Sequence, residues 1–500
     1  MEVGGLPCVI DLPNSLASGK SLRLTEDPCE EEIMDYKLLI NGALVDGAAT
    51  MPVLNPANEE VLADCPTASE AQLNEAVEAA QAGFKIWKNT PIEARRAKLG
   101  EIADIIDANA DDLARILTQE QGKPLQDAMG EIVGASMFFR YFQTLDLPVE
   151  ILEDSDTQRV EIHRNPLGVV GAIIPWNFPV LLLAFKLPAA LLGGNSIIIK
   201  PAPTTPLSAL HLGRLIADVL PAGVVNVIAE NNDLGDKITA HKGISKISFT
   251  GSTATGARVM ASAASTLKRI TLELGGNDAG IIMDDVDVEA VAPQIFQGAF
   301  GNNGQICIAM KRVYAHEAIY DKLVDELARL AEDAIVGNGL EQGTQLGPLQ
   351  NKMQFDKVKD YLDDARENGT IVAGGVVPEG KGYFIPPTIV RDIDEDSRLV
   401  REEQFGPVLP VIKYNDVEAV IERANDSEYG LGGSVWSSDV EQAYEVAKKV
   451  DSGTIWVNKH ADLQPHVPFG GIKTSGIGTE LGAEGLDEFT QRKVINVAKG

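Results

Sequence analysis

The spacing of hydrophobic residues changes along the chain and divides it into regions. Between about residues 67 and 121, apolar residues recur at helical spacing, which predicts two amphipathic helices. Thr67 and Glu70 form a candidate capping box for the first helix, and Pro91 opens the second. From 168 to 283, short runs that are apolar throughout alternate with helical stretches. This alternation is typical of a parallel sheet covered by helices on both faces.

A second alternation of strands and helices occupies roughly 284–475, so we predict an α/β fold with two sheet-containing units. Two segments outside these units, 149–163 and 490–497, mix charged and β-branched residues and have no obvious core of their own. We expect both to be strands that pair with another subunit. Residues 1–33 are rich in acidic residues without clear periodicity, which favours a solvated tail.

Composition excludes several classes of function. The net charge of −30 argues against nucleic acid and anionic membranes as partners, because both repel an acidic protein. The only membrane-like stretch, 169–185, is short and interrupted by proline and asparagine. Four scattered cysteines and six histidines without metal-ligand spacing predict no disulfide framework and no metal site. A cytoplasmic protein fits these features.

Three residues near predicted strand ends or in apolar surroundings are candidates for catalysis. Burial of Glu273 without a partner is costly, and desolvation would raise its pKa towards that of a useful general base. Asn177 could donate to a developing oxyanion or only satisfy the backbone of its turn. Cys307 suits buried packing as well as a nucleophilic role, because no histidine lies near it in sequence.

Two further features suit an anionic or hydroxylated ligand. Gly251 and Ser252 lie in a turn from a strand into a helix, where backbone N–H groups can bind phosphate. Lys200 closes a buried strand and could bind a ribose hydroxyl or a phosphate oxygen. Taken alone, an ordinary turn and a solvated loop lysine are the more common explanations of these two features.

Taken together, the motifs make the chain resemble the aldehyde dehydrogenase superfamily from about residue 36 to 497. The motifs occur in the family's order: PWNFP at 175–179, Lys200-Pro201, FTGST at 249–253, ELGG at 273–276, GQIC at 304–307, EQFGP at 403–407 and PFGG at 468–471. Each motif is weak alone, but their order over most of the chain is specific.

The resemblance implies NAD(P)-dependent oxidation of an aldehyde to a carboxylic acid. Cys307 would attack the aldehyde, and Asn177 with the Cys307 N–H would hold the oxyanion. Glu273 would then activate water to hydrolyse the thioester, which argues against the branch that forms acyl-CoA. The implied cofactor residues are Lys200 and Glu403 at the ribose hydroxyls, Phe405 at the nicotinamide end, Gly251 and Ser252 at the pyrophosphate, and Trp176 beside the dinucleotide.

One departure from the family pattern concerns the choice of cofactor. Relatives that strongly prefer NAD often carry a glutamate where this chain has Pro203. That carboxylate would accept the ribose hydroxyls and repel a 2′-phosphate. Its absence implies that NADP is tolerated, although NAD stays the expected cofactor.

By resemblance, the substrate tunnel is lined by Phe178, Leu182, Phe185, Gly301, Ile306 and Ile308, with Lys459, His460 and His466 towards its mouth. Gly301 stands where relatives often have a bulky aromatic residue, which would widen the tunnel. Lys459 and the two histidines could favour an acidic tail on the substrate or simply face water. A semialdehyde dehydrogenase acting on an ω-carboxylated aldehyde is therefore an alternative, and a catalytically silent relative is a more distant one.

The resemblance also implies the division of the chain. A Rossmann-like dinucleotide-binding domain would span 34–148 and 167–275, and an α/β catalytic domain 276–475. An arm of β-structure, 149–166 with 476–500, would mediate assembly into a homodimer or homotetramer.

Overall fold

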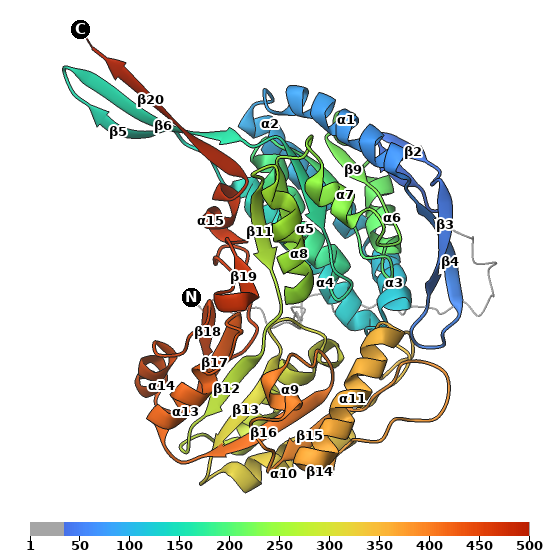
Figure 1. Ribbon diagram of the computed structural model, residues 1–500, viewed down its shortest axis with the longest axis vertical. Helices are drawn as coiled ribbons and strands as arrows, with labels where there is room; N and C mark the ends of the chain where they lie inside the picture. Colours follow the sequence, from blue (N-terminus) through green and yellow to red (C-terminus); the bar gives the residue numbers. More distant parts are fainter. Residues whose placement is uncertain (1–34, 500) are drawn as a thin grey trace, which may run out of the picture.

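The computed structural model describes residues 35–499, so the expected acidic tail lies outside the described residues. Two α/β layers lie one above the other in Figure 1, and an arm of strands projects from the upper layer with the C-terminus at its tip. None of the helices in the described range is long and apolar enough to cross a membrane.

Within residues 35–499, eight strands form the upper sheet in the order β19-β11-β10-β7-β8-β9-β1-β2. The strands from β11 to β9 are parallel, and every residue of β7, β8 and β10 is buried. Their continuous apolar sequences therefore fit a sheet covered on both faces. The strands are β1 (Leu38–Ile40), β2 (Ala43–Val45), β7 (Val169–Ile173), β8 (Ser196–Lys200), β9 (Val225–Val227), β10 (Lys246–Thr250), β11 (Arg269–Glu273) and β19 (Gly476–Ile477).

Helices cover this sheet, and the two predicted N-terminal helices differ from expectation in detail. The first capping box is formed by Ser69 and Gln72, because Thr67 is the last residue of strand β4 and its carbonyl accepts from Ala48. The second predicted helix is divided at Asn109 into α2 and α3. The helices are α1 (Glu70–Trp87), α2 (Ile92–Ala108), α3 (Ala110–Gln121), α4 (Leu125–Thr144), α5 (Pro179–Leu192), α6 (Leu207–Leu215), α7 (Gly235–Ala240), α8 (Thr253–Ala264) and α15 (Gly482–Asp487); β3 (Ala49–Leu54) and β4 (Val61–Thr67) form a separate hairpin.

Seven strands of the described chain form the lower sheet, in the order β14-β15-β16-β13-β12-β17-β18. Strand β12 belongs to this sheet, between β13 and β17, although the unbroken alternation from 168 to 283 placed it in the first series. Hydrophobic pattern does not distinguish between two parallel sheets. The strands are β12 (Asp278–Ile282), β13 (Met310–His316), β14 (Thr370–Ala373), β15 (Thr388–Arg391), β16 (Val408–Tyr414), β17 (Gly432–Trp436) and β18 (Thr454–Val457).

Helices of the second half pack mainly around this lower sheet (Figure 1). They are α9 (Val288–Phe300), α10 (Tyr320–Asp333), α11 (Lys352–Asn368), α12 (Arg398–Arg401), α13 (Val417–Asn425) and α14 (Val440–Ala447), with the short 3-10 turns η1 (Gly301–Gly304) and η2 (Lys473–Ser475).

The arm consists of β5 (Glu150–Asp154), β6 (Gln158–Pro166) and β20 (Thr490–Ala498). The two segments expected to pair with another subunit pair with one another within the chain, since β20 lies antiparallel to β6 along its whole length. The residues just before β20 do not belong to the arm. Strand β19 pairs with β11, and α15 packs on α5, so 476–489 completes the upper layer rather than the arm.

Candidate active site

The candidate residues meet where the parallel strands of the upper sheet end. Glu273 is the last residue of β11, Lys200 is the last residue of β8, and Asn177 follows β7 in the loop that leads into α5. Ser252 caps α8 after β10, and its hydroxyl accepts from the Thr255 N–H. Because all four strands are neighbours, their carboxyl ends face the lower layer together (Figure 1).

The loop that carries Cys307 has an unusual backbone. Asn302, Asn303 and Gly304 all have positive φ, a region that asparagine and glycine tolerate best. A Cβ on Gly304 would overlap the carbonyl of Gly406, so the GQIC and EQFGP motifs are in contact at a position that requires glycine. Asn303 Nδ2 donates to the Gly347 carbonyl at 3.0 Å, which fixes the loop to the lower layer.

The two glycines of the ELGG motif allow three segments to approach one another. A Cβ on Gly276 would lie 2.5 Å from the carbonyl oxygen of Cys307, and one on Gly275 would lie 2.5 Å from Oε2 of Glu403. The Gly276 N–H donates to Glu403 Oε1 at 2.9 Å. Strand β11 therefore meets the Cys307 loop and the Glu403 loop directly.

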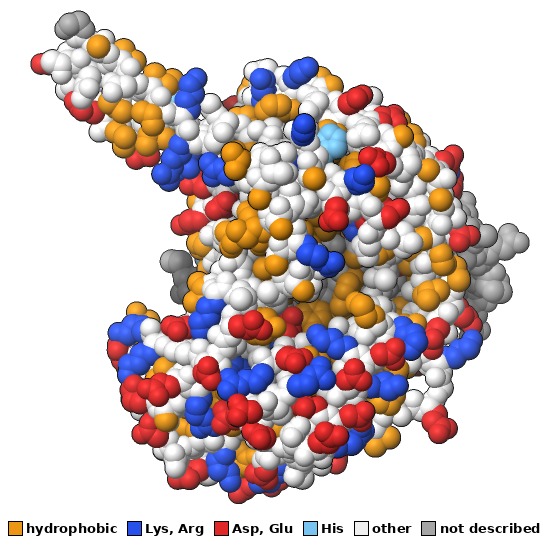
Figure 2. All heavy atoms as spheres, in the orientation of Figure 1, with side chains coloured by type: hydrophobic (Ala, Val, Ile, Leu, Met, Phe, Trp, Pro, Cys, Tyr) orange, Lys and Arg blue, Asp and Glu red, His pale blue; other side chains and the backbone are white. Residues whose placement is uncertain are grey.

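A cavity of about 120 Å³ connects these elements. Cys307, Glu273 and Asn177 all line it, although they lie far apart in the sequence. Its wall is mostly apolar, and six of the expected tunnel residues belong to it: Phe178, Leu182, Phe185, Gly301, Ile306 and Ile308. Figure 2 shows hydrophobic side chains gathered in the recess between the upper and lower layers.

The three residues expected at the tunnel mouth are not among those that line this cavity. His460 is fixed between the Ile308 carbonyl (2.8 Å) and Ser434 Oγ (3.0 Å), and burial lowers its pKa to about 4, so it is neutral. His466 is exposed. Lys459 forms an ion pair with Asp462 at 2.6 Å.

Asn177 is held in place from two sides. Its Nδ2 donates to the Gln305 carbonyl at 3.0 Å, which ties it to the Cys307 loop. Its own carbonyl accepts from Lys123 Nζ at 2.9 Å, and Lys123 in turn pairs with Glu131 at 2.5 Å in full burial. A side chain fixed in this way is suited to donate to an atom bound near Cys307.

Burial and neighbouring charges both act on Glu273. Burial raises its pKa well above the usual range, and the nearby carboxylate of Glu480 raises it further. Lys186 acts in the opposite direction, and it forms a buried ion pair with Glu480. A carboxyl group with a raised pKa is a more effective proton acceptor once ionised.

Sequence reasoning did not identify Lys186 and Glu480. Lys186 is the only charged residue in the apolar helix α5, which is a signal that could have been read. Glu480 is 294 positions away and has no comparable signal.

Cys307 is half-buried, and desolvation raises the pKa of its thiol to about 12, with Lys311 opposing the rise. Lys311 Nζ donates to the Cys307 carbonyl at 2.7 Å and to the Ile306 carbonyl at 2.9 Å. The resting thiol is therefore protonated, and its proton needs an acceptor before the sulfur can act as a nucleophile.

The remaining candidates are arranged in two groups along the edge of the upper sheet. Trp176 and Phe405 pack edge to face with ring centres 5.3 Å apart. Phe405 belongs to the same EQFGP motif as Glu403. Lys200 Nζ lies 2.6 Å from Glu230 Oε1 and donates to Asn232 Oδ1 at 2.9 Å. Pro203 is in the turn directly after β8, and Gly251 precedes α8.

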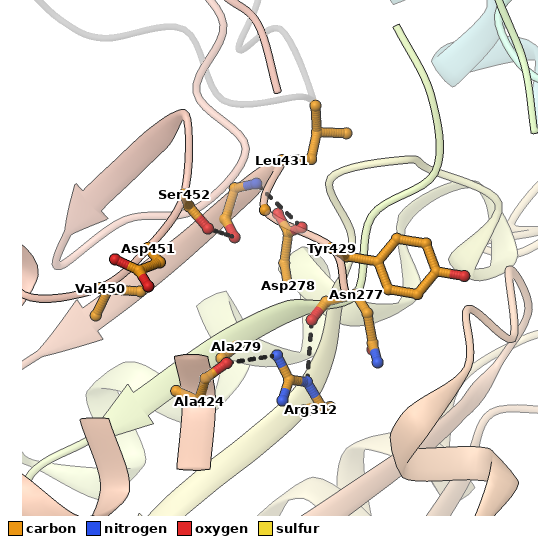
Figure 3. A pocket seen from close by; sticks show the side chains of 12 residues that line it. Asn277, Asp278, Ala279, Arg312, Ala424, Tyr429, Leu431, Val450, Asp451 and Ser452 are labelled. Carbon is orange, nitrogen blue, oxygen red and sulfur yellow. Dashed lines mark hydrogen bonds between the residues drawn. The ribbon is translucent and has the colours of Figure 1, made fainter. Parts of the chain in front are cut away.

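A second cavity, of about 10 Å³, is shown in Figure 3 and has room for no more than one water molecule. Asp278 accepts from the Gly432 N–H at 3.2 Å there, while Arg312 donates to the carbonyls of Asn277 and Ala424. This cavity is a structural junction between β12 and β17. Among residues 35–499, no group of three His, Cys, Asp or Glu side chains is placed to hold a metal ion.

Comparison with known proteins places these features in context. The model of the aldehyde dehydrogenase family matches residues 44–495. A probable aldehyde dehydrogenase from a Pseudomonas species is 42% identical over 489 residues, covering 96% of this chain and 99% of the relative. A phenylacetaldehyde dehydrogenase from Pseudomonas fluorescens is 37% identical and covers 93% and 96%. A solved aldehyde dehydrogenase from Bacillus cereus in complex with NAD+ is 38% identical, with a TM-score of 0.91 over 93% of this chain and 97% of the other.

Proposed function

The chain belongs to the aldehyde dehydrogenase family, and from this membership we propose that it oxidises an apolar aldehyde to the carboxylic acid with NAD(P)+. One observation carries the proposal: a thiol, a carboxylate of raised pKa and a fixed amide line one apolar cavity. In this scheme the upper layer binds the dinucleotide, and the lower layer supplies Cys307.

In the first half of the reaction, Cys307 Sγ adds to the carbonyl carbon of the aldehyde. Glu273 is the acceptor for the thiol proton, since it lines the same cavity and its ionised form is strongly basic. Asn177 Nδ2 donates to the oxygen of the resulting thiohemiacetal. Its anchoring to Gln305 and Lys123 keeps the amide oriented without reorganisation.

In the second half, loss of hydride leaves a thioester on Cys307. Once Glu273 has released the thiol proton to solvent, its carboxylate takes a proton from a water molecule, whose oxygen attacks the thioester carbon. The thiolate leaves and takes up the proton held by Glu273, which frees the carboxylic acid and restores the thiol. The thioester carbon would lie within the cavity that Glu273 lines.

The residues present fit a dinucleotide. Bound NAD(P)+ would supply the hydride acceptor. Glu403 and Lys200 offer an acceptor and a donor for ribose hydroxyls, and the N-terminus of α8 after Gly251 and Ser252 offers N–H groups for phosphate. Glu403 approaches Gly275 so closely that a side chain at position 275 would overlap it. The two glycines thus allow Glu403 to lie at the carboxyl end of β11, where the dinucleotide would bind. Trp176 and Phe405 would pack beside it.

The character of the cavity supports an apolar substrate over an ω-carboxylated one. Lys123 lines the cavity, but its charge is offset by Glu131. Lys459 is paired with Asp462, and His460 is neutral. An acidic tail would therefore meet the carboxylate of Asp127, while the ammonium of Lys123 is already paired with Glu131. Gly301 leaves room for an aromatic ring, and a Cβ there would reach Ile306 at 3.4 Å.

Purified protein should be assayed for formation of reduced nicotinamide with aromatic, aliphatic and ω-carboxylated aldehydes of equal length. We expect the highest kcat/KM with aromatic or medium-chain aliphatic aldehydes. A preference for the carboxylated aldehydes would contradict the substrate class while leaving the reaction intact.

The variant Cys307→Ala should lose at least about 10³-fold in turnover, because no other group can form the thioester. Its dissociation constant for NAD+ should change by less than about threefold. Loss of cofactor binding together with activity would assign Cys307 a structural role instead.

We further propose that the enzyme is cytoplasmic and forms a homodimer or homotetramer through its arm. The acidic composition and few cysteines support the first point. Exposed apolar residues on the arm support the second.

A further inference from the structure

The environment of Lys200 contains a carboxylate that none of the sequence motifs includes. Glu230 follows β9, the strand next to β8, so both side chains extend from the same edge of the upper sheet. The Lys200 ammonium lies 2.6 Å from Glu230 Oε1. Both groups are almost wholly shielded from water, with side-chain exposures of 7% and 0%, so little screening weakens their interaction.

The position of this carboxylate matters because of Pro203. A proline in the turn after β8 cannot accept from ribose hydroxyls or repel a phosphate through a side chain. With Pro203 alone, Lys200 would be an uncompensated cation at the ribose, which attracts a 2′-phosphate. The ion pair with Glu230 removes most of that attraction. A 2′-phosphate bound at Lys200 would also lie next to the negative charge of Glu230.

A ribose hydroxyl has different requirements. An ammonium group carries three N–H donors, so the contacts with Glu230 and Asn232 do not exhaust it. Lys200 can therefore still donate to a neutral hydroxyl while its charge is balanced. The pair favours the hydroxylated ribose over the phosphorylated one.

We propose that Glu230 sets a preference for NAD+ over NADP+ in this protein, by neutralising Lys200 from the neighbouring strand in place of the carboxylate missing at Pro203. This inference rests on the proposed dinucleotide site. Glu230 acts through Lys200 and is a specificity-determining residue rather than a catalytic one.

The test is the ratio of two dissociation constants, measured by calorimetry on the full-length protein with NAD+ and NADP+ and no aldehyde. Adenosine 5′-monophosphate and adenosine 2′,5′-bisphosphate serve as smaller probes of the site for the adenosine ribose, without and with the 2′-phosphate. In the unaltered protein we expect NAD+ to bind at least about tenfold more tightly than NADP+.

Glu230→Gln should shift this ratio towards NADP+ by about tenfold. Glutamine keeps an oxygen for the Leu234 N–H, which Glu230 Oε2 now accepts at 2.8 Å, so the start of α7 is preserved. A purely structural effect would weaken both cofactors equally and leave the ratio unchanged, which would overturn the inference.

Two further variants distinguish the effect of the Glu230 charge on Lys200 from the effect of other charges nearby. Asp233→Asn removes an exposed negative charge from the same loop and should leave the ratio unchanged; an equal shift would mean that general loop charge, not Glu230, decides the preference. Adding Pro203→Glu to Glu230→Gln should restore the preference for NAD+. Failure of the unaltered protein to bind either dinucleotide would instead contradict the proposed function itself.

Discussion

At the residue scale, the site depends on buried charges that alter one another. Glu273, Glu480 and Lys186 form a coupled group in which two carboxylates share one ammonium. Such coupling makes the pH dependence of the reaction sensitive to residues that never touch the substrate.

Glu480→Gln should move the pH dependence of thioester hydrolysis. Glu273 acts as a base only when ionised, so the hydrolysis rate rises with pH through its raised pKa. Removing the Glu480 charge lowers that pKa, and the rising limb should move to lower pH by about one unit. The measurement is the pH profile of single-turnover hydrolysis.

Lys186→Met should shift the pH profile in the opposite direction. Loss of the ammonium raises the pKa of Glu273, so the rising part of the profile moves to higher pH. If the rising part of the pH profile lies at the same pH in both variants and in the unaltered protein, Glu480 and Lys186 do not influence the pKa of Glu273.

The sequence identified the three groups proposed to react but not the groups that perturb them. Cys307, Glu273 and Asn177 stand in recognisable motifs, and the cavity contains all three. Glu480 and Glu230 act through partners on other elements, and no local pattern marks such pairs. Whether Lys459 favours an acidic substrate or faces water could not be decided from the sequence, because a sequence does not show that Lys459 is paired with Asp462.

At the scale of elements, the expectations that differ from the structure concern where a β-strand ends and with which strand it pairs. The predicted capping box failed because strand pairing extends β4 through Thr67 and displaces the helix start to Ser69. The arm was predicted to be extended structure, and the pairing of β20 with β6 within the chain was not predicted. Hydrophobic pattern gives the type of an element more reliably than its partner.

Replacing apolar residues on the arm should test its role in assembly. Ile151 and Val494 are 51% and 60% exposed, and Figure 2 shows hydrophobic side chains along the arm. An exposed apolar patch is typical of protein–protein interfaces, which supports the proposed role of the arm. We expect Ile151→Asp with Val494→Asp to shift the molar mass in light scattering towards the monomer.

A control substitution at Gln491, an exposed polar residue of β20, should leave the molar mass unchanged. An unaltered oligomer in the double variant would place the subunit interface elsewhere.

At the scale of the whole molecule, the hydrophobic alternation predicted two sheets, but by itself it did not assign β12 to the lower one. Its residues are as apolar as those of the upper sheet, and only the crossing at Gly275 and Gly276 sends it into the lower layer. That crossing buries Asp278 at the start of the lower sheet, with an effect on the stability of the entire fold (Figure 3).

Burial raises the pKa of Asp278 to about 7 in the folded protein, from an ordinary value near 3.8. Between these values the folded state holds a proton that the unfolded state has lost. The free energy of unfolding therefore falls as pH rises through this range and levels off above about pH 7. In Asp278→Asn, which cannot ionise, the melting temperature should fall less between pH 5 and pH 8.

Asp451→Asn is the matched control, because Asp451 is an exposed carboxylate at the same cavity. It should retain the slope of the unaltered protein. An equally steep fall in the Asp278 variant would assign the pH dependence to other groups.

The return of the chain to the upper sheet has a consequence for biosynthesis. Strand β19 and Glu480 are translated after the whole lower sheet, although β11 and Lys186 were made some two hundred residues or more earlier. On the ribosome, the growing upper sheet therefore has an open edge at β11 and an apolar helix whose ammonium lacks its counter-ion. Only emergence of β19 and Glu480 closes both, so the cavity acquires its final charge balance after the lower sheet has been made.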